Sequence, residues 1–361
     1  MSQRLTVVGY TLRMRLVLDA AENAAHGEWL RSTPGAYEWW YFDARSDCGL
    51  WTIAAIWFLG NPFSPYYRQA AQGKFSDPLV HNALFFALYR NGKLYAYHFT
   101  RFPDEQIETP AALPGTLRLG ANLLEIDPCG LFTLTLQDEN ANGRRLDASL
   151  CFEAPPLSSQ PAEEAGVGHS DFWLPVAPSC RVSGNITLRG PQNGSLSEQI
   201  TFQGHGYHDH NWGKLPFNSH LKDWYWARAA LPCERAVILY HVRSNNPYGS
   251  ARPESHLLLF ESGKLLLHDP DAQVSLSRRT INGFGMLYAT RLAAESGALQ
   301  VRFDFGTRLD SAPFYLRVLC AAEVISGGVR ERGQGVGEYF RPRLLASPLV
   351  ASATKARIVT R

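Results

Sequence analysis

The amino-acid sequence predicts an all-β fold of the sandwich or barrel kind. Short runs of alternating or continuous apolar residues recur along the whole chain, which is typical of β-strands. Turn signals separate these runs at intervals of about 8–12 residues, a spacing that favours sandwiches and barrels over alternating strands and helices. No glycine-rich strand-to-helix turn and no Gly-x-x-x-x-Gly-Lys phosphate loop interrupts the pattern, which argues against nucleotide chemistry.

Strands are expected wherever such a run lies between turn residues. The clearest pair flanks Asn91-Gly92, a dipeptide that suits the mirror-image turn of a β-hairpin because both residues tolerate positive φ. In chain order, the expected strands are Tyr37–Ala44, Leu50–Leu59, Ala83–Tyr89, Leu94–Phe99, Thr116–Leu119, Leu123–Ile126, Leu131–Gln137, Arg145–Phe152, Arg181–Leu188, Glu198–Gly204, Ala236–Val242, Ser255–Glu261, Gly263–His268, Leu299–Phe305 and Phe314–Ala322.

Helices and linkers are few. Short helices are expected near Ala20–Arg31 and Asp223–Ala229. Ala154–Gly168 is rich in proline and small polar residues, and we expect it to form a loop or linker. A boundary near residues 155–190 divides the chain into two β-rich halves, 1–180 and 181–361. The length of 361 residues allows about two domains of ordinary size.

The composition excludes several classes of protein. Lys and Arg number 35 against 33 Asp and Glu, so the charge gives no reason to expect nucleic acid or an anionic membrane as partner. Apolar residues make up 45% of the chain, yet no apolar stretch is long enough for a transmembrane segment. Met1–Leu18 mixes arginines with short apolar runs and gives little sign of export. The six cysteines are widely spread, which is typical of reduced thiols in a cytosolic protein. They are Cys48, Cys129, Cys151, Cys180, Cys233 and Cys320.

The segment Tyr37–Ala44 contains four consecutive aromatic residues between two carboxylates. In an extended strand, Glu38, Trp40 and Phe42 share one face. Trp39, Tyr41 and Asp43 share the other. Such a strand either fills the interior of a barrel with its rings or lines a large apolar pocket. In a pocket of that kind burial disfavours the ionised form of a carboxyl group and raises its pKa.

The segment Gly204–Gly213 is the richest in chemistry, because it holds three histidines, an aspartate and an asparagine between glycines. In an extended strand, Tyr207, Asp209 and Asn211 share one face. His208, His210 and Trp212 share the other. An aromatic cluster, Trp224–Arg228, follows. A hydrogen-bonded structural knot is the alternative to a functional site, since Asp and Asn beside glycine also serve turns.

Acid–base catalysis on an apolar substrate fits these residues better than the other chemistries. A His-x-His metal site needs a further ligand close by, and no carboxylate follows His210 until Asp223. A serine hydrolase needs a Gly-x-Ser-x-Gly elbow, which is absent from the sequence. Protonation of a carbon–carbon double bond requires a positioned acid and ring faces that stabilise the developing cation. Asp209 is the first candidate acid and Glu38 the second.

At these segments the chain resembles the hydroxyneurosporene synthase (carotenoid hydratase, CrtC) family, which also includes the AttH-like proteins and the fungal decalin-forming Diels–Alderases. The resemblance is collinear over most of the chain, and the Tyr-x-Asp-His-Asn-Trp-Gly core is its most specific part. The matching stretches are Glu38–Asp43, His81–Leu84, Ala87–Tyr89, Leu117–Gly120, Trp173–Pro178, Gly206-Tyr207-x-Asp209-x-Asn211-x-Gly213, Trp224-x-Trp226-x-Arg228 and Gly335-x-Gly337-Glu338-Tyr339.

The resemblance implies two consecutive lipocalin-like β-barrels, residues 1–180 and 181–361, with a hydrophobic pocket at or between them. It implies that Asp209 is the general acid of a cofactor-independent enzyme, and that water is captured at a tertiary cation. His208 or His210 would then share its proton, and Tyr207 and Asn211 would orient it. The walls of the pocket would be Trp39, Trp40, Tyr41, Trp212, Trp224 and Trp226.

Two further residues have alternative roles. Arg228 is expected to pair with Asp209 or Glu38, to stack on a ring, or to form an ordinary structural ion pair. Glu338 is expected to close a barrel or to reach the pocket.

The expected partner is a hydrophobic polyene or prenyl-like small molecule, without a metal or another cofactor. The enzyme would add water to its double bonds, isomerise them or cyclise them. A Diels–Alderase-type pericyclase would need only confinement of the substrate, and no acid. A carrier of a lipophilic ligand and a metal-dependent oxygenase are the alternatives from other classes. The sequence indicates neither the oligomeric state nor whether the substrate is a carotenoid, a polyketide, an alkaloid or another terpenoid.

Overall fold

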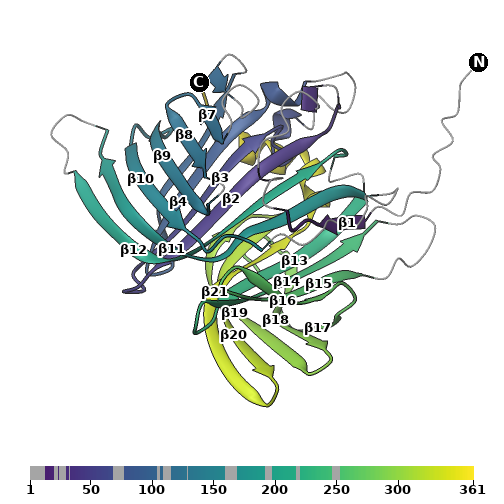
Figure 1. Ribbon diagram of the computed structural model, residues 1–361. Helices are drawn as coiled ribbons and strands as arrows, with labels where there is room; N and C mark the ends of the chain where they lie inside the picture. Colours follow the sequence, from purple (N-terminus) through teal and green to yellow (C-terminus); the bar gives the residue numbers. More distant parts are fainter. Residues whose placement is uncertain are drawn as a thin grey trace, which may run out of the picture.

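Two curled β-sheets, of 13 and nine strands, build the protein (Figure 1). The computed structural model describes residues 13–19, 23, 30–31, 33–67, 77–103, 106–108, 115–127, 129–158, 169–191, 197–216, 220–245 and 253–361. The prediction of an all-β fold is confirmed. No helix within these residues is long and apolar enough to cross a lipid bilayer.

The first sheet contains the strands of the N-terminal part of the chain together with the last short strand. Its order is β22 (Val359–Thr360), β5 (Lys93–Phe102), β4 (Asn82–Arg90), β3 (Trp51–Leu59), β2 (Tyr37–Ser46), β12 (Glu198–Gly213), β11 (His169–Arg189), β10 (Arg145–Glu153), β9 (Leu131–Glu139), β8 (Asn122–Ile126), β7 (Thr116–Leu119) and β6 (Ile107–Glu108). A further strand, β1 (Arg13–Leu16), pairs in parallel with β11.

The second sheet lies below the first in Figure 1 and is coloured green to yellow. Its order is β16 (Lys264–Asp269), β15 (Glu254–Glu261), β14 (Arg235–Ser244), β13 (Leu221–Ala230), β21 (Val329–Phe340), β20 (Tyr315–Ser326), β19 (Leu299–Ser311), β18 (Leu287–Ser296) and β17 (Gln273–Ile281). The helical segments with both ends inside the described residues include η2 (Pro78–Val80), η4 (Pro342–Ala346) and α4 (Pro348–Lys355).

Local sequence signals account for most strands. The hairpin at Asn91-Gly92 is confirmed, because both residues have positive φ (50° and 73°) between β4 and β5. The sequence prediction missed six strands, namely β1, β6, β17, β18, β21 and β22. The division at residue 180 stays a prediction about folding units; the hydrogen-bonded sheets change over between Gly213 and Leu221.

The predicted helix at Asp223–Ala229 is wrong, because this segment is strand β13. Its residues alternate with period two: Tyr225, Ala227 and Ala229 pack into the core of the second sheet. Trp224 and Trp226 belong to the other hydrophobic cluster, which fills the first sheet and reaches the space between the sheets. The predicted helix Ala20–Arg31 lies almost wholly outside the described residues.

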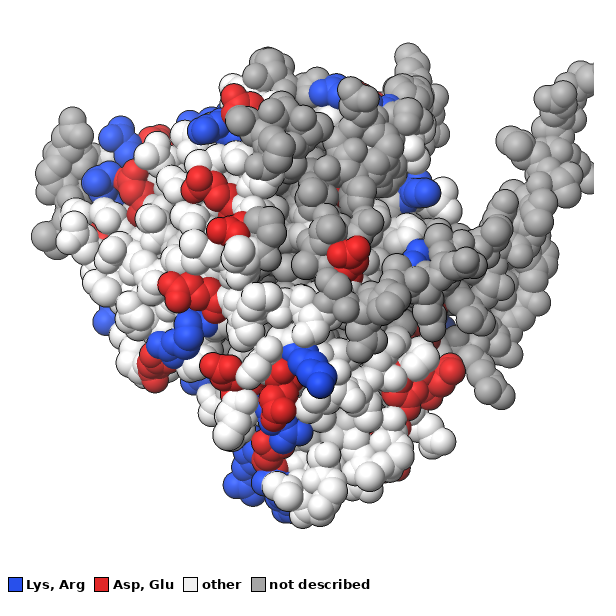
Figure 2. Space-filling view, viewed as in Figure 1, with Lys and Arg blue, Asp and Glu red and all other residues white. Residues whose placement is uncertain are grey.

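The charges on the visible face of the molecule are mixed. Figure 2 shows Lys and Arg interspersed with Asp and Glu, without a large area of one sign on that face. This agrees with the near-neutral net charge of +2.

Candidate functional site

Strands β2 and β12 are neighbours in the first sheet, and their register places the two chemistry-rich segments side by side. Tyr41 lies opposite Asp209, and Trp39 lies opposite Asn211. Because residues directly opposite in a β-ladder point to the same face, the side chains of these four residues share one face. That face is directed toward the second sheet, where Tyr41 meets the ring of Trp226 edge-on at 5.7 Å between ring centroids.

A small cavity of about 40 Å³ lies between the sheets at this point. Strands β13, β14 and β21 of the second sheet complete it. Its lining is Trp39, Tyr41, Asp209, Asn211, Trp224, Trp226, Tyr240 and Glu338. The structure therefore brings together six of the residues given acid, orienting or wall roles from the sequence. Glu338, one of whose two expected positions was the pocket, also lines the cavity, and Tyr240 is added from β14.

The Asp209 carboxyl group is buried, with 6% of the residue exposed. Three side chains donate hydrogen bonds to it: Trp173 Nε1 (3.0 Å), Tyr207 Oη (2.9 Å) and Asn211 Nδ2 (2.8 Å). Burial raises the pKa of Asp209 to about 7; the three donors oppose this shift and the nearby negative charge of Glu338 adds to it. At neutral pH this group therefore exists in both its acid and its ionised form.

Glu338 is the second carboxylate of the cavity. Tyr315 Oη donates a hydrogen bond to it, and Arg317 Nε donates another at 3.1 Å. Arg317 is itself buried, and its guanidinium group lies 5.4 Å from the centroid of the Tyr41 ring. These contacts hold the Glu338 carboxyl group in place at the edge of the cavity, opposite the strand that carries Asp209.

Arg228 has a different partner from the two expected. It forms a buried ion pair with Asp43, with Nε at 3.3 Å from Oδ2, and lies over the ring of Tyr207 at 5.6 Å. Tyr41 Oη donates to the same Asp43 oxygen at 3.0 Å. Burial lowers the pKa of Arg228 to about 10, which leaves the group charged at neutral pH.

The expected proton partnership between Asp209 and its neighbouring histidines is not found, because both rings lie on the opposite face of β12. His208 stacks on Phe42 at 3.9 Å, and its Nδ1–H donates to the carbonyl oxygen of Tyr41 at 3.0 Å. Phe42 also contacts Phe132 on β9, four strands away in the sheet order, so this face lines the inside of the curled first sheet. Burial lowers the pKa of His208 to about 3, which keeps the ring neutral.

The other candidates on this inner face are also placed away from the cavity. His210 Nε2–H donates to Glu38 Oε1 at 2.8 Å, and the His210 ring stacks on Trp40 at 4.5 Å. Trp212 stacks on Phe172 at 5.3 Å. Glu38, Trp40, His210 and Trp212 therefore contribute to the packed interior of the first sheet and do not line the cavity beside Asp209. No three His, Cys, Asp or Glu side chains in the described part of the chain are arranged to hold a metal ion.

The sequence indicated no role for two residues of the site, Trp173 and Tyr240, and left the role of a third, Glu338, open. Trp173 on β11 lies in a stretch that matches the family but was given no role, and Tyr240 on β14 carries no local signal beyond its aromatic character. Glu338 could have been ranked higher, because it is the one charged residue in the otherwise apolar end of β21, Gly335–Phe340.

Comparisons with known proteins place the chain in a family. The family model for carotenoid hydratase CrtC matches residues 55–361. An acyclic carotenoid 1,2-hydratase of Thiocapsa roseopersicina is 31% identical over 328 residues, covering 89% of this chain and 72% of the relative. A hydroxyneurosporene dehydrogenase of Chlorobaculum tepidum is 27% identical over 369 residues, covering 96% of this chain and 92% of the relative.

Two solved structures share the fold. An AttH-type protein of Nitrosomonas europaea superposes with a TM-score of 0.59 at 17% identity, covering 89% of this chain and 95% of that chain. The structure of CghA with Sch210972 gives 0.57 at 15% identity, covering 85% and 89%. These two likenesses concern the fold alone, whereas the family model covers most of the sequence. The chain therefore belongs to the carotenoid hydratase CrtC family of enzymes.

Proposed function

We propose that this enzyme adds water to a terminal carbon–carbon double bond of an acyclic carotenoid or a similar polyene, with Asp209 as the general acid. The observation that carries the proposal is a protonatable carboxyl group, with a pKa of about 7, inside a cavity walled by aromatic rings. The names of the carotenoid hydratase relatives support the choice of substrate class.

The first step of the proposed reaction is a proton transfer. The Asp209 carboxyl proton is given to the double-bond carbon that carries a hydrogen atom. The π electrons form the new C–H bond and leave a tertiary cation on the dimethyl-substituted carbon at the end of the chain. The faces of Tyr41, Trp226 and the neighbouring rings stabilise this cation. The hydrogen bonds from Trp173, Tyr207 and Asn211 hold the carboxyl group in place and stabilise the carboxylate that forms.

The second step consumes water. The oxygen atom of a water molecule bonds to the cation, and one of its protons passes to the Glu338 carboxylate. Return of this proton to Asp209 by way of solvent restores the starting state, so the net change is the addition of one water molecule. Trp226 Nε1 has no hydrogen-bond acceptor among the described residues, and it can hold the attacking water by donating to it.

The small volume of the cavity constrains how the substrate binds. A space of about 40 Å³ is enough for roughly one or two water molecules and is smaller than a prenyl end group. Binding of the polyene end therefore requires the aromatic walls of the cavity to move apart. Trp39 and Trp224 form the wall on the side of the cavity that is remote from Arg228.

The test is the variant Asp209→Asn, which keeps the shape of the side chain and removes the proton that it can give. We expect turnover of lycopene, an acyclic carotenoid, to fall by about 10³-fold, within the range for loss of a general acid. The control is Asp147→Asn, which makes the same chemical change in an exposed ion pair with Arg189 on β10. Activity of Asp209→Asn near that of the wild type would remove the acid role and favour catalysis by confinement alone.

A further inference from the structure

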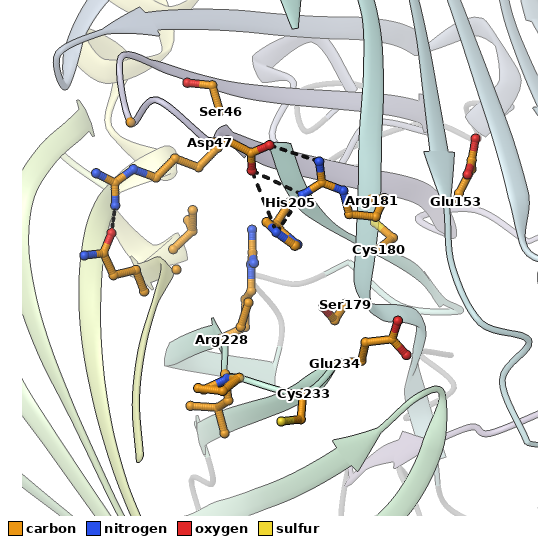
Figure 3. A pocket seen from close by; sticks show the side chains of 18 of the residues that line it. Ser46, Asp47, Glu153, Ser179, Cys180, Arg181, His205, Arg228, Cys233 and Glu234 are labelled. Carbon is orange, nitrogen blue, oxygen red and sulfur yellow. Dashed lines mark hydrogen bonds and ion pairs between the residues drawn. The ribbon is translucent and has the colours of Figure 1, made fainter. Parts of the chain in front are cut away.

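A second and much larger cavity, of about 590 Å³, lies between the same two sheets. Charged and polar side chains line much of it, among them Arg45, Asp47, Arg181 and His205 (Figure 3). Figure 3 shows Asp47, Arg181 and His205 joined by polar contacts beside Arg228, with Arg181 held to Asp47 at 2.9 Å. Cys48 and Cys233 also line the cavity and are exposed, so it opens to solvent. We call it the polar cavity.

The polar cavity and the Asp209 cavity lie one after the other along the same interface between the two sheets. On β2 and β12 the directly opposed pairs Trp39–Asn211, Tyr41–Asp209, Asp43–Tyr207 and Arg45–His205 follow one another along the same face. On β13 and β21 the corresponding pairs are Trp224–Phe340, Trp226–Glu338, Arg228–Val336 and Ala230–Gln334. In each of these two ladders, the first two pairs lie at the Asp209 cavity or next to it. The last pair of each ladder, Arg45–His205 or Ala230–Gln334, lines the polar cavity.

The third pair of each ladder forms the partition between the two cavities. Arg228 from β13 lines the polar cavity and is paired across the interface with Asp43 from β2. Both side chains are nearly inaccessible, at 2% and 0% exposure. Polar contacts link this ion pair to the Asp209 cavity in two ways. Tyr41, which lines that cavity, donates its hydroxyl hydrogen to Asp43. Arg228 lies over the ring of Tyr207, and the hydroxyl group of Tyr207 donates to Asp209.

The other end of the same interface is aromatic. Phe340 lies directly opposite Trp224, and the half-buried Phe63 packs against Phe340 with ring centroids 5.2 Å apart. A hydrocarbon chain is disfavoured in a cavity lined by charged groups, because those groups would lose their hydration. Aromatic rings, in contrast, pack favourably against a hydrocarbon chain. Water shows the opposite preference.

We propose that the polar cavity is the water side of the active site: water reaches Asp209 and Glu338 from it through the Asp43–Arg228 layer, and the polyene enters from the aromatic end. This inference rests on the proposed function, since only a hydration reaction needs a supply of water at a cation. It assigns a role to a buried ion pair that no step of the chemistry uses directly. Two reactions compete for the tertiary cation: it captures water and gives the hydrated product, or it loses a proton from an adjacent carbon and returns to an alkene. The supply of water therefore sets the ratio of hydrated product to alkene.

The test fills the polar cavity without changing the catalytic groups. Ala230→Phe on β13 and Gln334→Phe on β21 each place a ring in it from a different strand. The matched control is Ala293→Phe, a half-buried alanine on β18 in the same sheet that does not line this cavity. Each protein is incubated with lycopene in deuterated buffer. Mass spectrometry then separates hydrated product from alkene that has gained deuterium through protonation and deprotonation.

We expect the ratio of hydrated product to deuterated alkene to fall by about fivefold or more in both cavity variants and to stay unchanged in Ala293→Phe. Misfolded protein contributes to neither product, so the ratio is independent of the folded fraction. An unchanged ratio in a cavity variant that turns over lycopene overturns the inference and leaves the proposed function intact. Wild-type enzyme that forms neither product overturns the proposed function itself.

A second measurement covers the case in which neither variant folds. Wild-type enzyme is treated with a bulky maleimide, which reacts with the exposed thiols of Cys48 and Cys233 at the polar cavity and with the exposed Cys129 elsewhere. In the double variant Cys48→Ser, Cys233→Ser, Cys129 is the one of these three positions that the maleimide can still label. We expect the product ratio to fall on labelling of the wild type and not on labelling of the double variant. Equal ratios in the two labelled proteins overturn the inference.

Discussion

The two faces of β2 and β12 are made from consecutive residues, and both are rich in polar groups among aromatic rings. On the inner face, the polar groups of His208, His210 and Glu38 hydrogen-bond to their neighbours, and both histidine rings are stacked on aromatic rings. On the outer face, Asp209 is held by three donors and borders an unfilled space. A carboxyl group, for example, is part of the packed interior on the inner face, where Glu38 lies, and borders a cavity on the outer face, where Asp209 lies.

The difference between the faces lies in what surrounds each polar group rather than in its chemical type. A buried polar group that is fully hydrogen-bonded and packed contributes to a unique core. A buried carboxyl group beside an unfilled space has a shifted pKa and room for a reactant, which are the marks of a functional site. Four predictions test this distinction.

The largest expected effect is that of Glu338→Gln. Loss of the carboxylate that accepts the proton from water should lower the rate of hydration by about 10²-fold. The variant also removes a negative charge that raises the pKa of Asp209, so the midpoint of the pH–rate profile should move to lower pH. Glu323→Gln on β20 is the control, since Glu323 pairs only with arginines away from the cavity. A reduced rate with an unmoved midpoint would indicate a structural role for Glu338.

His208→Ala tests the inner face directly. Loss of the stacked ring and its hydrogen bonds should lower the free energy of unfolding by about 3 kcal/mol, measured by urea denaturation. The rate per folded molecule should stay within about threefold of the wild type, because the ring does not border the cavity. A rate loss as large as that of Asp209→Asn, at full folding, would return His208 to the catalytic group.

The pH dependence of the rate tests the outer face. The acid form of Asp209 is the active form, and its pKa is about 7, so the rate of protonation should be constant well below pH 7. It should fall about tenfold for each pH unit above 7, as the carboxyl group loses the proton that it must donate. Steady-state rates between about pH 5 and pH 9 provide the measurement. A rate that increases through this range would exclude Asp209 as the acid.

The smallest expected effect compares two tryptophans. Trp226 and Trp57 both have an indole N–H without an acceptor among the described residues, but only Trp226 borders the cavity. Trp226→Phe should lower the hydration rate by about fivefold, the value of one hydrogen bond to the attacking water. Trp57→Phe, in the core beside Phe42, should leave the rate unchanged. Equal effects of the two variants would argue against a water held by Trp226.

Alternation within a strand was readable from the sequence, and this explains which site predictions succeeded. Trp39, Tyr41, Asp209 and Asn211 share a face because side chains alternate with period two, and the ladder between β2 and β12 keeps them in register. The same rule already placed His208 and His210 on the face opposite Asp209, so a hydrogen bond between either ring and that carboxyl group was incompatible with an extended strand. The helix expected at Asp223–Ala229 failed for a related reason, since short apolar segments fit either period.

The sequence by itself determined most of the strands, the family and the choice of candidate acid, because these depend on local patterns and on a motif within ten residues. Only the tertiary structure decided that Glu338 faces Asp209, that Arg228 pairs with Asp43, and that a polar cavity and an aromatic one share the space between the sheets. These contacts join residues more than a hundred positions apart. Their pairing follows from how two curled sheets pack against each other, which no local pattern of residues encodes.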